Sequence, residues 1–204
     1  MNIIDGIITT ILFLGYLILW EIKRKELMKS TGIDANVIVK AEKPIQKYFG
    51  NLENVMTIAV IIIIVAHTLL NPDTLILKRV SAINSTIYKM IGFAIGILGL
   101  TICRIAQTTI GNSWRVGIDE NAKPGLAKNG IYRTIRNPTY SGLFTLCVGV
   151  LIINPTVLFL YWVLTFFIIM EFQVRCEEEY LEQIYGDEYI EYFKTTKRYV
   201  PYIY

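Results

Sequence analysis

Four long stretches of this sequence contain at most one charged residue each, and these stretches indicate its architecture. Residues 3–20 contain a single charge, Asp5, while residues 55–71, 91–103 and 137–170 contain none. A membrane-spanning helix needs about 20 predominantly apolar residues, so each of the first three stretches, with its flanks, predicts one spanning helix. The pattern therefore predicts an all-α integral membrane protein.

The fourth stretch is too long for one helix and is interrupted near its middle. Asn154 and Pro155 divide its 34 uncharged residues, and proline both lacks a backbone donor and restricts the residue before it. A tight turn there predicts a helical hairpin with arms at 139–153 and 156–170. Each arm reaches only roughly 22 Å, short of a hydrocarbon core of about 30 Å. Two alternatives follow: part of the polar flank continues the helices, or the hairpin does not cross the membrane fully. We expect about five transmembrane helices, the last two a short helical hairpin, followed by a cytosolic C-terminal helical tail.

The chain is interpreted as a single domain, residues 1–204, in two parts. Three membrane helices and their connecting loops occupy 1–105, and a loop, the hairpin and the tail helices occupy 106–204. Glycine and proline punctuate the segment 28–52. This segment is expected to form short amphipathic pieces that lie on the bilayer.

Composition agrees with a membrane protein, and the positive charges predict its orientation. The chain is 53% hydrophobic and 18% charged, with a mean hydropathy of +0.46. Lysine and arginine number seven in residues 21–52, five in 106–136 and four after the hairpin, but two in 71–86. By the positive-inside rule, the three richer segments are cytoplasmic and the N-terminus lies outside. The positive charges are spread over several loops, so the net charge of +3 gives no footprint for nucleic acid.

Histidine and cysteine do not suggest a metal site. His67 is the only histidine, and it lies in an apolar stretch without cysteine, aspartate or glutamate, so we expect an interhelical hydrogen bond. Cys103, Cys147 and Cys176 are isolated and are interpreted as small apolar residues. The basic residues at 23–25 follow the first apolar run, which is typical of a retained anchor and not of a cleaved leader.

The loop before the hairpin contains the first candidate site. Pro124-Gly125 and Asn129-Gly130 are strong turn signals. Pro138 suits the first turn of a helix, and Asn137 suits the N-cap position before it. A helix N-terminus beside glycine-rich loops can bind a ligand with an anionic group.

The C-terminal tail after the hairpin contains a second candidate site, which is rich in acidic residues. Residues 171–185 are compatible with a helix ending at Gly186, and a second short helix is expected from Asp187 to about Thr196. The glutamates at 177–179 are consecutive and so point in different directions. Two interpretations stay open here: a solvated acidic helix face, or carboxylates of a site beside the basic loop.

Two motifs in these segments resemble the isoprenylcysteine carboxyl methyltransferase family and, more broadly, the membrane phospholipid methyltransferase superfamily. Residues 126–142 read LAKNGIYRTIRNPTYSG, similar to the family's L-V-x-x-G-x-Y-x-x-x-R-H-P-x-Y-x-G. Residues 177–192 read EEEYLEQIYGDEYIEY, similar to E-E-x-x-L-x-x-x-F-G-x-E-Y-x-x-Y. Arg198 and Pro201 match the closing R-x-x-P. The resemblance covers about 110–204, and earlier residues match in hydropathy only.

The resemblance implies an S-adenosylmethionine-dependent methyltransferase whose lipophilic or prenylated acceptor comes from the bilayer. The acceptor group it implies is the carboxylate of an isoprenylcysteine-like substrate. The implied cofactor-binding residues are Pro124, Gly125, Leu126, Ala127, Lys128, Gly130, Tyr132, Asn137, Pro138, Thr139, Tyr140, Glu177 and Glu178. The implied catalytic positions are Asn137, Gln173 and Arg175.

Two departures from the family pattern bear on the acceptor. Asn137 stands where the family has the histidine before proline, and an amide cannot carry a proton near neutral pH. Gln173 stands where the family has an arginine thought to hold the substrate carboxylate. Arg175 lies two positions further on, and so on another side of an ideal helix.

Methyl transfer from a sulfonium needs alignment, a dry site and charge complementarity. A carboxylate or thiolate needs no base, whereas an amine must first lose a proton. We expect a tunnel from the bilayer between the third helix and the hairpin, meeting a cytosolic cofactor pocket. The alternatives are N- or S-methylation of an amino-lipid or small thiol, a sterol-type NADPH-dependent reductase, and a non-catalytic membrane scaffold.

Overall fold

The computed structural model describes residues 3–38, 43–69, 78–81, 84–118 and 125–203. Its elements, in chain order, are α1 (Ile3–Thr31), α2 (Pro44–Leu69), α3 (Thr86–Ile110), the 3-10 helices η3 (Gly111–Ser113) and η4 (Gly130–Arg133), α4 (Pro138–Ile153), α5 (Val157–Tyr185) and α6 (Asp187–Thr195). Across these ranges the regular structure is helical, joined by isolated backbone bridges. The predicted all-α fold is confirmed.

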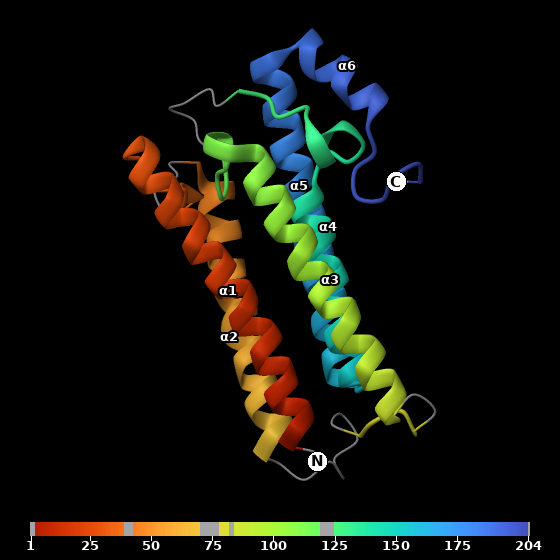
Figure 1. Cartoon of the computed structure of the whole chain (residues 1–204). Helices are drawn as coiled ribbons and strands as arrows, with labels where there is room; N and C mark the ends of the chain where they lie inside the picture. The colour runs from red at the N-terminus through yellow and green to blue at the C-terminus, as the bar shows by residue number, and fades with distance from the viewer. Residues whose placement is uncertain (1–2, 39–42, 70–77, 82–83, 119–124, 204) are drawn as a thin grey trace.

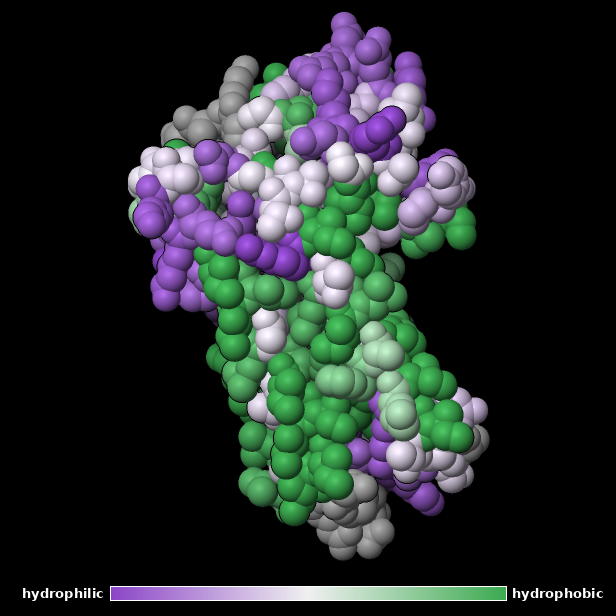
Figure 2. All heavy atoms as spheres, in the orientation of Figure 1, coloured by the Kyte–Doolittle hydropathy of each residue, from purple (hydrophilic) through white to green (hydrophobic). Residues whose placement is uncertain are grey.

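The helices form an elongated bundle with a hydrophobic middle. In Figure 1, α1 and α2 run side by side along one flank, α3, α4 and α5 run along the other, and α6 crosses the end at which α5 finishes. Within the described residues, α1, α2, α3 and α5 are long and apolar enough to cross a membrane, and α4 is a shorter apolar helix. Figure 2 shows a broad hydrophobic band below a hydrophilic end. The chain is a multi-pass integral membrane protein.

The predicted hairpin is present, but its second arm is much longer than expected. α4 ends at Ile153, and α5 runs without interruption for 29 residues to Tyr185. Of the two alternatives for the short arms, the structure has the first: the polar flank 171–185 continues the second arm, because no glycine or proline interrupts the helix before Gly186. At 1.5 Å per residue α5 is roughly 43 Å long. It thus extends from the hairpin turn to the hydrophilic end.

The first two helices are also longer than their apolar stretches. α1 continues to Thr31 and α2 begins at Pro44, so both ends of the segment 28–52 belong to long helices. The expected surface pieces are wrong because residues 21–31 are mostly strong helix formers, which continue the helix beyond its apolar part. This extension places Glu53 inside α2.

Helices α3 and α4 meet along a seam of glycines. A Cβ at Gly99 would lie 2.6 Å from the Gly142 carbonyl oxygen, and one at Gly149 would lie 2.6 Å from that of Gly92. Glycine allows this approach, as small residues do between membrane helices. Backbone therefore occupies the space between the third helix and the first arm of the hairpin, and the tunnel predicted there is wrong.

A buried polar cluster closes the end of the bundle opposite α6. The Arg79 guanidinium donates to Asp5 Oδ2 at 2.6 Å, and Lys89 Nζ lies 3.0 Å from the same oxygen. Arg79 also donates to Asn154 Oδ1 at 3.0 Å, and the Asn154 amide donates to Thr9 Oγ1 at 2.6 Å. These contacts tie the start of α1 to the hairpin turn and to the segment before α3.

His67 links α2 to the start of α5. Its Nε2 lies 2.9 Å from Thr156 Oγ1, and its Nδ1 lies 2.9 Å from the Ile63 carbonyl oxygen. The imidazole packs against Phe159 with ring centroids 4.7 Å apart. The predicted interhelical hydrogen bond is confirmed.

Candidate active site

Backbone pairing brings three distant segments to the hydrophilic end of the bundle. Asn36 and Val116 form a parallel bridge, and Ile135 and Lys197 form another. The Arg136 N–H donates to the Lys197 carbonyl oxygen at 2.8 Å. The loop before the hairpin and the C-terminal tail therefore share one end, as predicted, together with the loop after α1 (Figure 1). The membrane side that this end faces stays a prediction.

A cavity of about 750 Å³ lies at this end, with walls from α1, α2, α4 and α5. Its α5 wall is a single stripe of residues three or four positions apart, which share one helix face. The stripe consists of Trp162, Phe166, Met170, Gln173, Glu177, Leu181 and Tyr185. Its first part is aromatic and apolar, and it becomes polar at Gln173.

The apolar part of the cavity is held in shape by aromatic packing. The rings of Trp162 and Phe166 stack with centroids 5.2 Å apart and an interplanar angle of 6°. The Trp162 indole donates to the Met56 carbonyl oxygen at 3.1 Å, which joins α5 to α2. Phe13 of α1 and Val60 of α2 add to the lining. This surface suits a hydrocarbon chain.

The polar part is centred on Glu177. The Tyr140 hydroxyl donates to Glu177 Oε1 at 2.9 Å, and the Gln173 amide donates to the same oxygen at 3.2 Å. Gln173 is buried, and its carbonyl oxygen has no hydrogen-bond partner among the described residues. Glu53 of α2 also lines the cavity and contacts Gln173. The cavity therefore brings two carboxylates from different helices to one glutamine.

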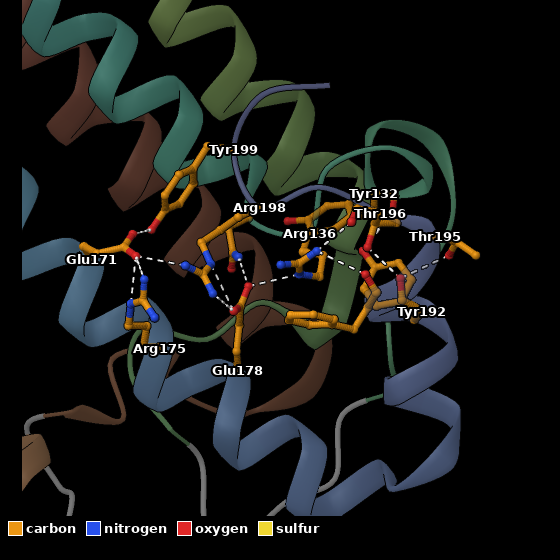
Figure 3. A network of polar contacts seen from close by, with 12 residues as sticks. Tyr132, Arg136, Glu171, Arg175, Glu178, Tyr192, Thr195, Thr196, Arg198 and Tyr199 are labelled. Carbon is orange, nitrogen blue, oxygen red and sulfur yellow. Dashed lines mark hydrogen bonds and ion pairs between the residues drawn. The ribbon is translucent and has the colours of Figure 1, made fainter. Parts of the chain in front are cut away.

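Glu178, next to Glu177 in sequence, belongs to a different environment. Arg136 Nε donates to its Oε1 at 3.0 Å, and Arg198 Nη2 donates to its Oε2 at 2.8 Å (Figure 3). The side chains of this ion-pair network are 7–11% exposed. Asn137 donates to Glu178 Oε1 at 2.8 Å. Glu178 therefore ties the start of α4 to the C-terminal segment.

Asn137 occupies the predicted N-cap position of α4 but does not cap the helix with its side chain. Its amide nitrogen donates to the Glu178 carboxylate, a charge-assisted hydrogen bond that sets the position of the side chain. Pro138 occupies the first turn as predicted. Asn137 and Pro138 both line the cavity.

Tyrosines of η4 and α6 complete the polar part. The Tyr192 hydroxyl donates to the Tyr132 carbonyl oxygen at 2.8 Å. Burial raises the pKa of the Tyr132 phenol, which therefore stays neutral at physiological pH. The Tyr189 residue is 1% exposed, lines the cavity, and has a hydroxyl without a partner among the described residues. This hydroxyl is itself enclosed, so the part of Tyr189 that lines the cavity is its ring.

The structure gathers most of the predicted site residues around the cavity. Those that line it are Gly125, Leu126, Ala127, Tyr132, Asn137, Pro138, Thr139, Tyr140, Gln173 and Glu177. Lys128 forms an exposed ion pair with Glu188 at 2.6 Å, and Gly130 begins η4 with a φ of 53°. Pro124 lies outside the described residues.

The other predicted catalytic position, Arg175, lies away from the cavity. Its side chain is 56% exposed, and Arg175 Nε donates to Glu171 Oε1 at 2.8 Å (Figure 3). Glu171 also accepts from Arg198 at 2.9 Å and from Tyr199 at 2.6 Å. Arg175 thus extends the network of Glu178, on a different face of α5 from Gln173 and Glu177.

Glu53 is a charged residue of the cavity wall that the sequence did not reveal. It lies between the predicted surface segment 28–52 and the uncharged stretch 55–71, and no prediction included it. The available signal was helical spacing: Glu53, Met56 and Val60 recur at three and four positions and line the cavity together. In the described part of the chain, no group of three or more histidine, cysteine, aspartate or glutamate residues is arranged to hold a metal ion.

The fold has a solved counterpart. It matches the structure of the eukaryotic intramembrane Ras methyltransferase, isoprenylcysteine carboxyl methyltransferase, with a TM-score of 0.56 and 19% sequence identity. The match covers 96% of this chain and 68% of that chain. Almost the whole chain therefore has the fold of this class of intramembrane protein.

Sequence comparison then gives the family. The family model described as phospholipid methyltransferase matches residues 87–188, which is half of the chain. The chain belongs to the phospholipid methyltransferase family.

Named relatives narrow the comparison within the family. The chain is 32% identical over 121 residues to the protein-S-isoprenylcysteine O-methyltransferase of Saccharomyces cerevisiae. It is 30% identical over 118 residues to protein-S-isoprenylcysteine O-methyltransferase B of Arabidopsis thaliana, and 33% identical over 121 residues to a probable one of Oryza sativa subsp. japonica. The matches cover 55–56% of this chain and 49–61% of these relatives, so the chain matches about half the length of each.

Proposed function

We propose that this chain is a membrane-embedded methyltransferase that binds S-adenosylmethionine and methylates a lipophilic acceptor from the bilayer. The observation that carries the proposal is one continuous cavity. At its polar part Tyr140 and Glu177, one from each family motif, are hydrogen-bonded to each other. At its apolar part the aromatic residues of α5 offer a surface for a hydrocarbon tail. Family membership and the names of the relatives support the same reaction.

The polar part of the cavity fits the proposed cofactor. Glu177 supplies a carboxylate for a cationic group, and the Tyr140 hydroxyl holds that carboxylate in place. The motif residues 125–127 and Tyr132 would line the rest of the cofactor site. When bound, S-adenosylmethionine supplies a methyl group on a positively charged sulfonium.

The chain itself contributes position and a dry environment. The Tyr140 hydroxyl and the Gln173 amide fix the Glu177 carboxylate from two helices, α4 and α5. The stacked rings of Trp162 and Phe166 shield the inner part of the cavity. Alignment and exclusion of water are the contributions that a displacement at a methyl carbon needs most.

The acceptor has two candidate chemistries. The names of the relatives support the carboxylate of an isoprenylcysteine-like substrate. The Glu53 carboxylate on the cavity wall favours an acceptor with N–H groups instead, because a carboxylate only accepts hydrogen bonds. In both cases the apolar part of the cavity would hold the tail. Family membership favours methyl transfer over a reductase or a scaffold.

The proposed orientation follows the positive charges. The cavity end contains the three segments rich in lysine and arginine, and the opposite end contains the N-terminus (Figure 1). The cofactor would therefore enter from the cytoplasm, and the acceptor from the bilayer.

Calorimetric titration with S-adenosylhomocysteine tests the proposal. Glu177→Ala removes the carboxylate of the polar part, and Tyr140→Ala removes the hydroxyl that holds it. Loss of a hydrogen bond to a charged group is worth about 1.5–3 kcal/mol, so we expect each variant to bind roughly 10- to 150-fold more weakly.

Glu179→Ala is the matched control, because it removes the same charge from an exposed neighbouring position. It should bind the ligand as the wild type does. Wild-type titration curves for Glu177→Ala and Tyr140→Ala would sink the residue assignment. No binding by the folded wild type would refute the cofactor itself.

A further inference from the structure

We propose that the C-terminal turn, residues 200–203, inserts into the interface of the bilayer beside α4 and so attaches the segment next to the cavity to the membrane. The turn lies outside the residues 87–188 that match the family model. The proposal concerns a surface of the molecule and does not depend on the proposed function.

The C-terminal turn exposes apolar side chains at the hydrophilic end of the bundle. Val200 is 45% exposed, Ile203 is 77% exposed and Tyr202 is 88% exposed. Exposed apolar area becomes favourable only when it leaves water. Neighbouring apolar side chains on a surface therefore indicate contact with a partner or a membrane.

The backbone of the turn has a conformation that is unusual for its sequence. The Ile203 N–H donates to the Val200 carbonyl oxygen at 3.2 Å, which closes a four-residue turn. Tyr202 has a φ of 66°, a value that glycine or asparagine normally supplies at this position of a turn. A tyrosine there costs free energy. Because its side chain is almost fully exposed, we expect a contact outside the chain to offset this cost.

Tyr199 fixes the start of the turn at the border between the charged and the apolar parts of the bundle. Its hydroxyl donates to Glu171 Oε2 at 2.6 Å (Figure 3), whereas its ring packs edge-on against Phe144 with centroids 5.1 Å apart. Phe144 belongs to the uncharged stretch 137–170. The Ser141 hydroxyl, in the first turn of α4, donates to the Tyr199 carbonyl oxygen at 2.7 Å. The residues after Tyr199 therefore leave the protein at the border of the hydrophobic band.

The shape of the molecule places a lipid surface next to the turn. Figure 1 shows the chain turning back from α6 towards the middle of the bundle, with its end to one side of α4. In Figure 2, hydrophobic atoms project at that place, close to the hydrophobic band. A bilayer that covers the band thus reaches the turn as well.

Exposed cations accompany the turn. Lys194 and Lys197 precede it, and both are exposed. Arg133, also exposed, precedes Thr134, whose carbonyl oxygen accepts from the Lys197 N–H at 2.9 Å. Lysine and arginine suit the level of the lipid phosphates, and tyrosine is enriched at the same depth. Apolar side chains beside cations are typical of a segment that lies in the membrane interface.

Backbone pairing connects the turn to the candidate active site. The Arg136 N–H donates to the Lys197 carbonyl oxygen at 2.8 Å, and the Asn137 N–H donates to the Arg198 carbonyl oxygen at 3.1 Å. Asn137 and the following Pro138 line the cavity. An inserted turn therefore fixes, through residues 197–199, the start of α4 relative to the bilayer.

A fluorescent label at the turn measures its depth. Tyr202→Cys is labelled with a nitrobenzoxadiazole maleimide in a Cys176→Ser background, since Cys103 and Cys147 are buried. The protein is placed in phosphatidylcholine discs. Iodide quenches labels in water, and phosphatidylcholine with a spin label near the glycerol end of its acyl chain quenches labels at the interface.

Two further labelled positions calibrate the measurement. Glu182→Cys lies at an exposed position of the charged half of α5, and Ile168→Cys lies at an exposed position within the uncharged stretch. We expect iodide to quench the label at 202 about threefold less than the label at 182, and the spin-labelled lipid to quench it about half as strongly as the label at 168. Equal quenching by iodide at 202 and 182 would overturn the proposal.

A substituted turn tests whether its own apolar side chains drive the insertion. Val200→Ser combined with Ile203→Ser should return the label at 202 to the iodide quenching seen at 182. Ile33→Ser, an exposed apolar position on the loop after α1, is the matched control and should leave the label in lipid. A label that stays in lipid in the double variant would mean that the fluorophore, and not the turn, inserts, and this result contradicts the proposal.

The same measurement separates lipid from a protein partner. A label shielded from iodide but not quenched by the spin-labelled lipid would show that protein, such as a second copy of this chain, covers the turn, and this also overturns the proposal. The experiment needs neither cofactor nor turnover. Failure of the proposed methyltransferase function, seen as no binding of S-adenosylhomocysteine, therefore leaves its outcome unaffected.

Discussion

Asp5 at one end of the helix bundle and Glu177 at the other are carboxylates with different kinds of partner. Asp5, at one end, is 1% exposed and has two cations of its own, Arg79 at 2.6 Å and Lys89 at 3.0 Å. At the other end Glu177 is held by the neutral donors Tyr140 and Gln173. A carboxylate paired within the protein fixes the fold, whereas one held by neutral donors can receive a cationic ligand.

The same contrast separates two consecutive residues of α5. Glu178 accepts from Arg136 and Arg198 and joins chain segments, while Glu177 faces the cavity. Consecutive helical residues point about 100° apart, so one position decides between the two environments. The charge of a residue therefore does not distinguish a structural carboxylate from a ligand-binding one. The helix face on which the residue lies does distinguish them.

The largest effect that sharpens this comparison is expected at Glu178. Glu178→Ala leaves the Arg136 and Arg198 guanidinium groups buried without their shared carboxylate, which costs about 3–5 kcal/mol. Thermal and denaturant unfolding in detergent should show this loss. Glu179→Ala, the exposed neighbour, should unfold as the wild type does. A Glu178→Ala variant of unchanged stability would break the distinction between the two glutamates.

The next effect is a change of ligand preference at the cavity. Gln173→Arg gives Glu177 a neighbouring cation of the kind that Asp5 already has. The ratio of the affinity for hexadecanoic acid to that for hexadecylamine should then rise roughly 10- to 100-fold. The acid gains a charge-assisted hydrogen bond to the new arginine, and the ammonium group of the amine is repelled by it. Tryptophan quenching in phosphatidylcholine discs measures the ratio.

Gln183→Arg is the matched control for that substitution, since it adds the same charge to an exposed position of α5. It should leave the ratio of acid to amine affinity unchanged. An equal shift in both variants would mean that surface charge, and not the cavity, sets the preference.

Much of the fold could be predicted from hydropathy. The uncharged stretches located the helices, and Pro155 located the hairpin turn, because both depend on local chemistry. The length of α5 could not be read in the same way, since its charged half looks like a separate tail. A change from apolar to charged residues marks the membrane boundary, and the helix continues across it to Gly186.

The residues of the candidate site could likewise be predicted only in part. The motif residues, such as Tyr140 and Glu177, could be predicted from the sequence, and the structure brings them into contact. For Glu53 the sequence offers only its helical spacing with Met56 and Val60, and its place on the cavity wall depends on the packing of α2 against α5. The close packing of α3 against α4, which excludes the predicted tunnel, does have a local signal. Gly92, Gly96 and Gly99 are spaced to form a helix-packing face.

The smallest effect is expected at the far end of the bundle, at Asp5. Asp5→Asn keeps an oxygen that can accept from Arg79 but removes the charge that pairs with Lys89. Charge-assisted hydrogen bonds are about twice as strong as neutral ones, so the loss in unfolding free energy should be about 1–2 kcal/mol. Binding of S-adenosylhomocysteine and of hexadecylamine should stay at the wild-type value, because this cluster lies at the opposite end from the cavity (Figure 1). A weaker ligand affinity with unchanged stability would mean that the polar cluster acts on the cavity through the helices, and the two ends could then no longer be treated as independent.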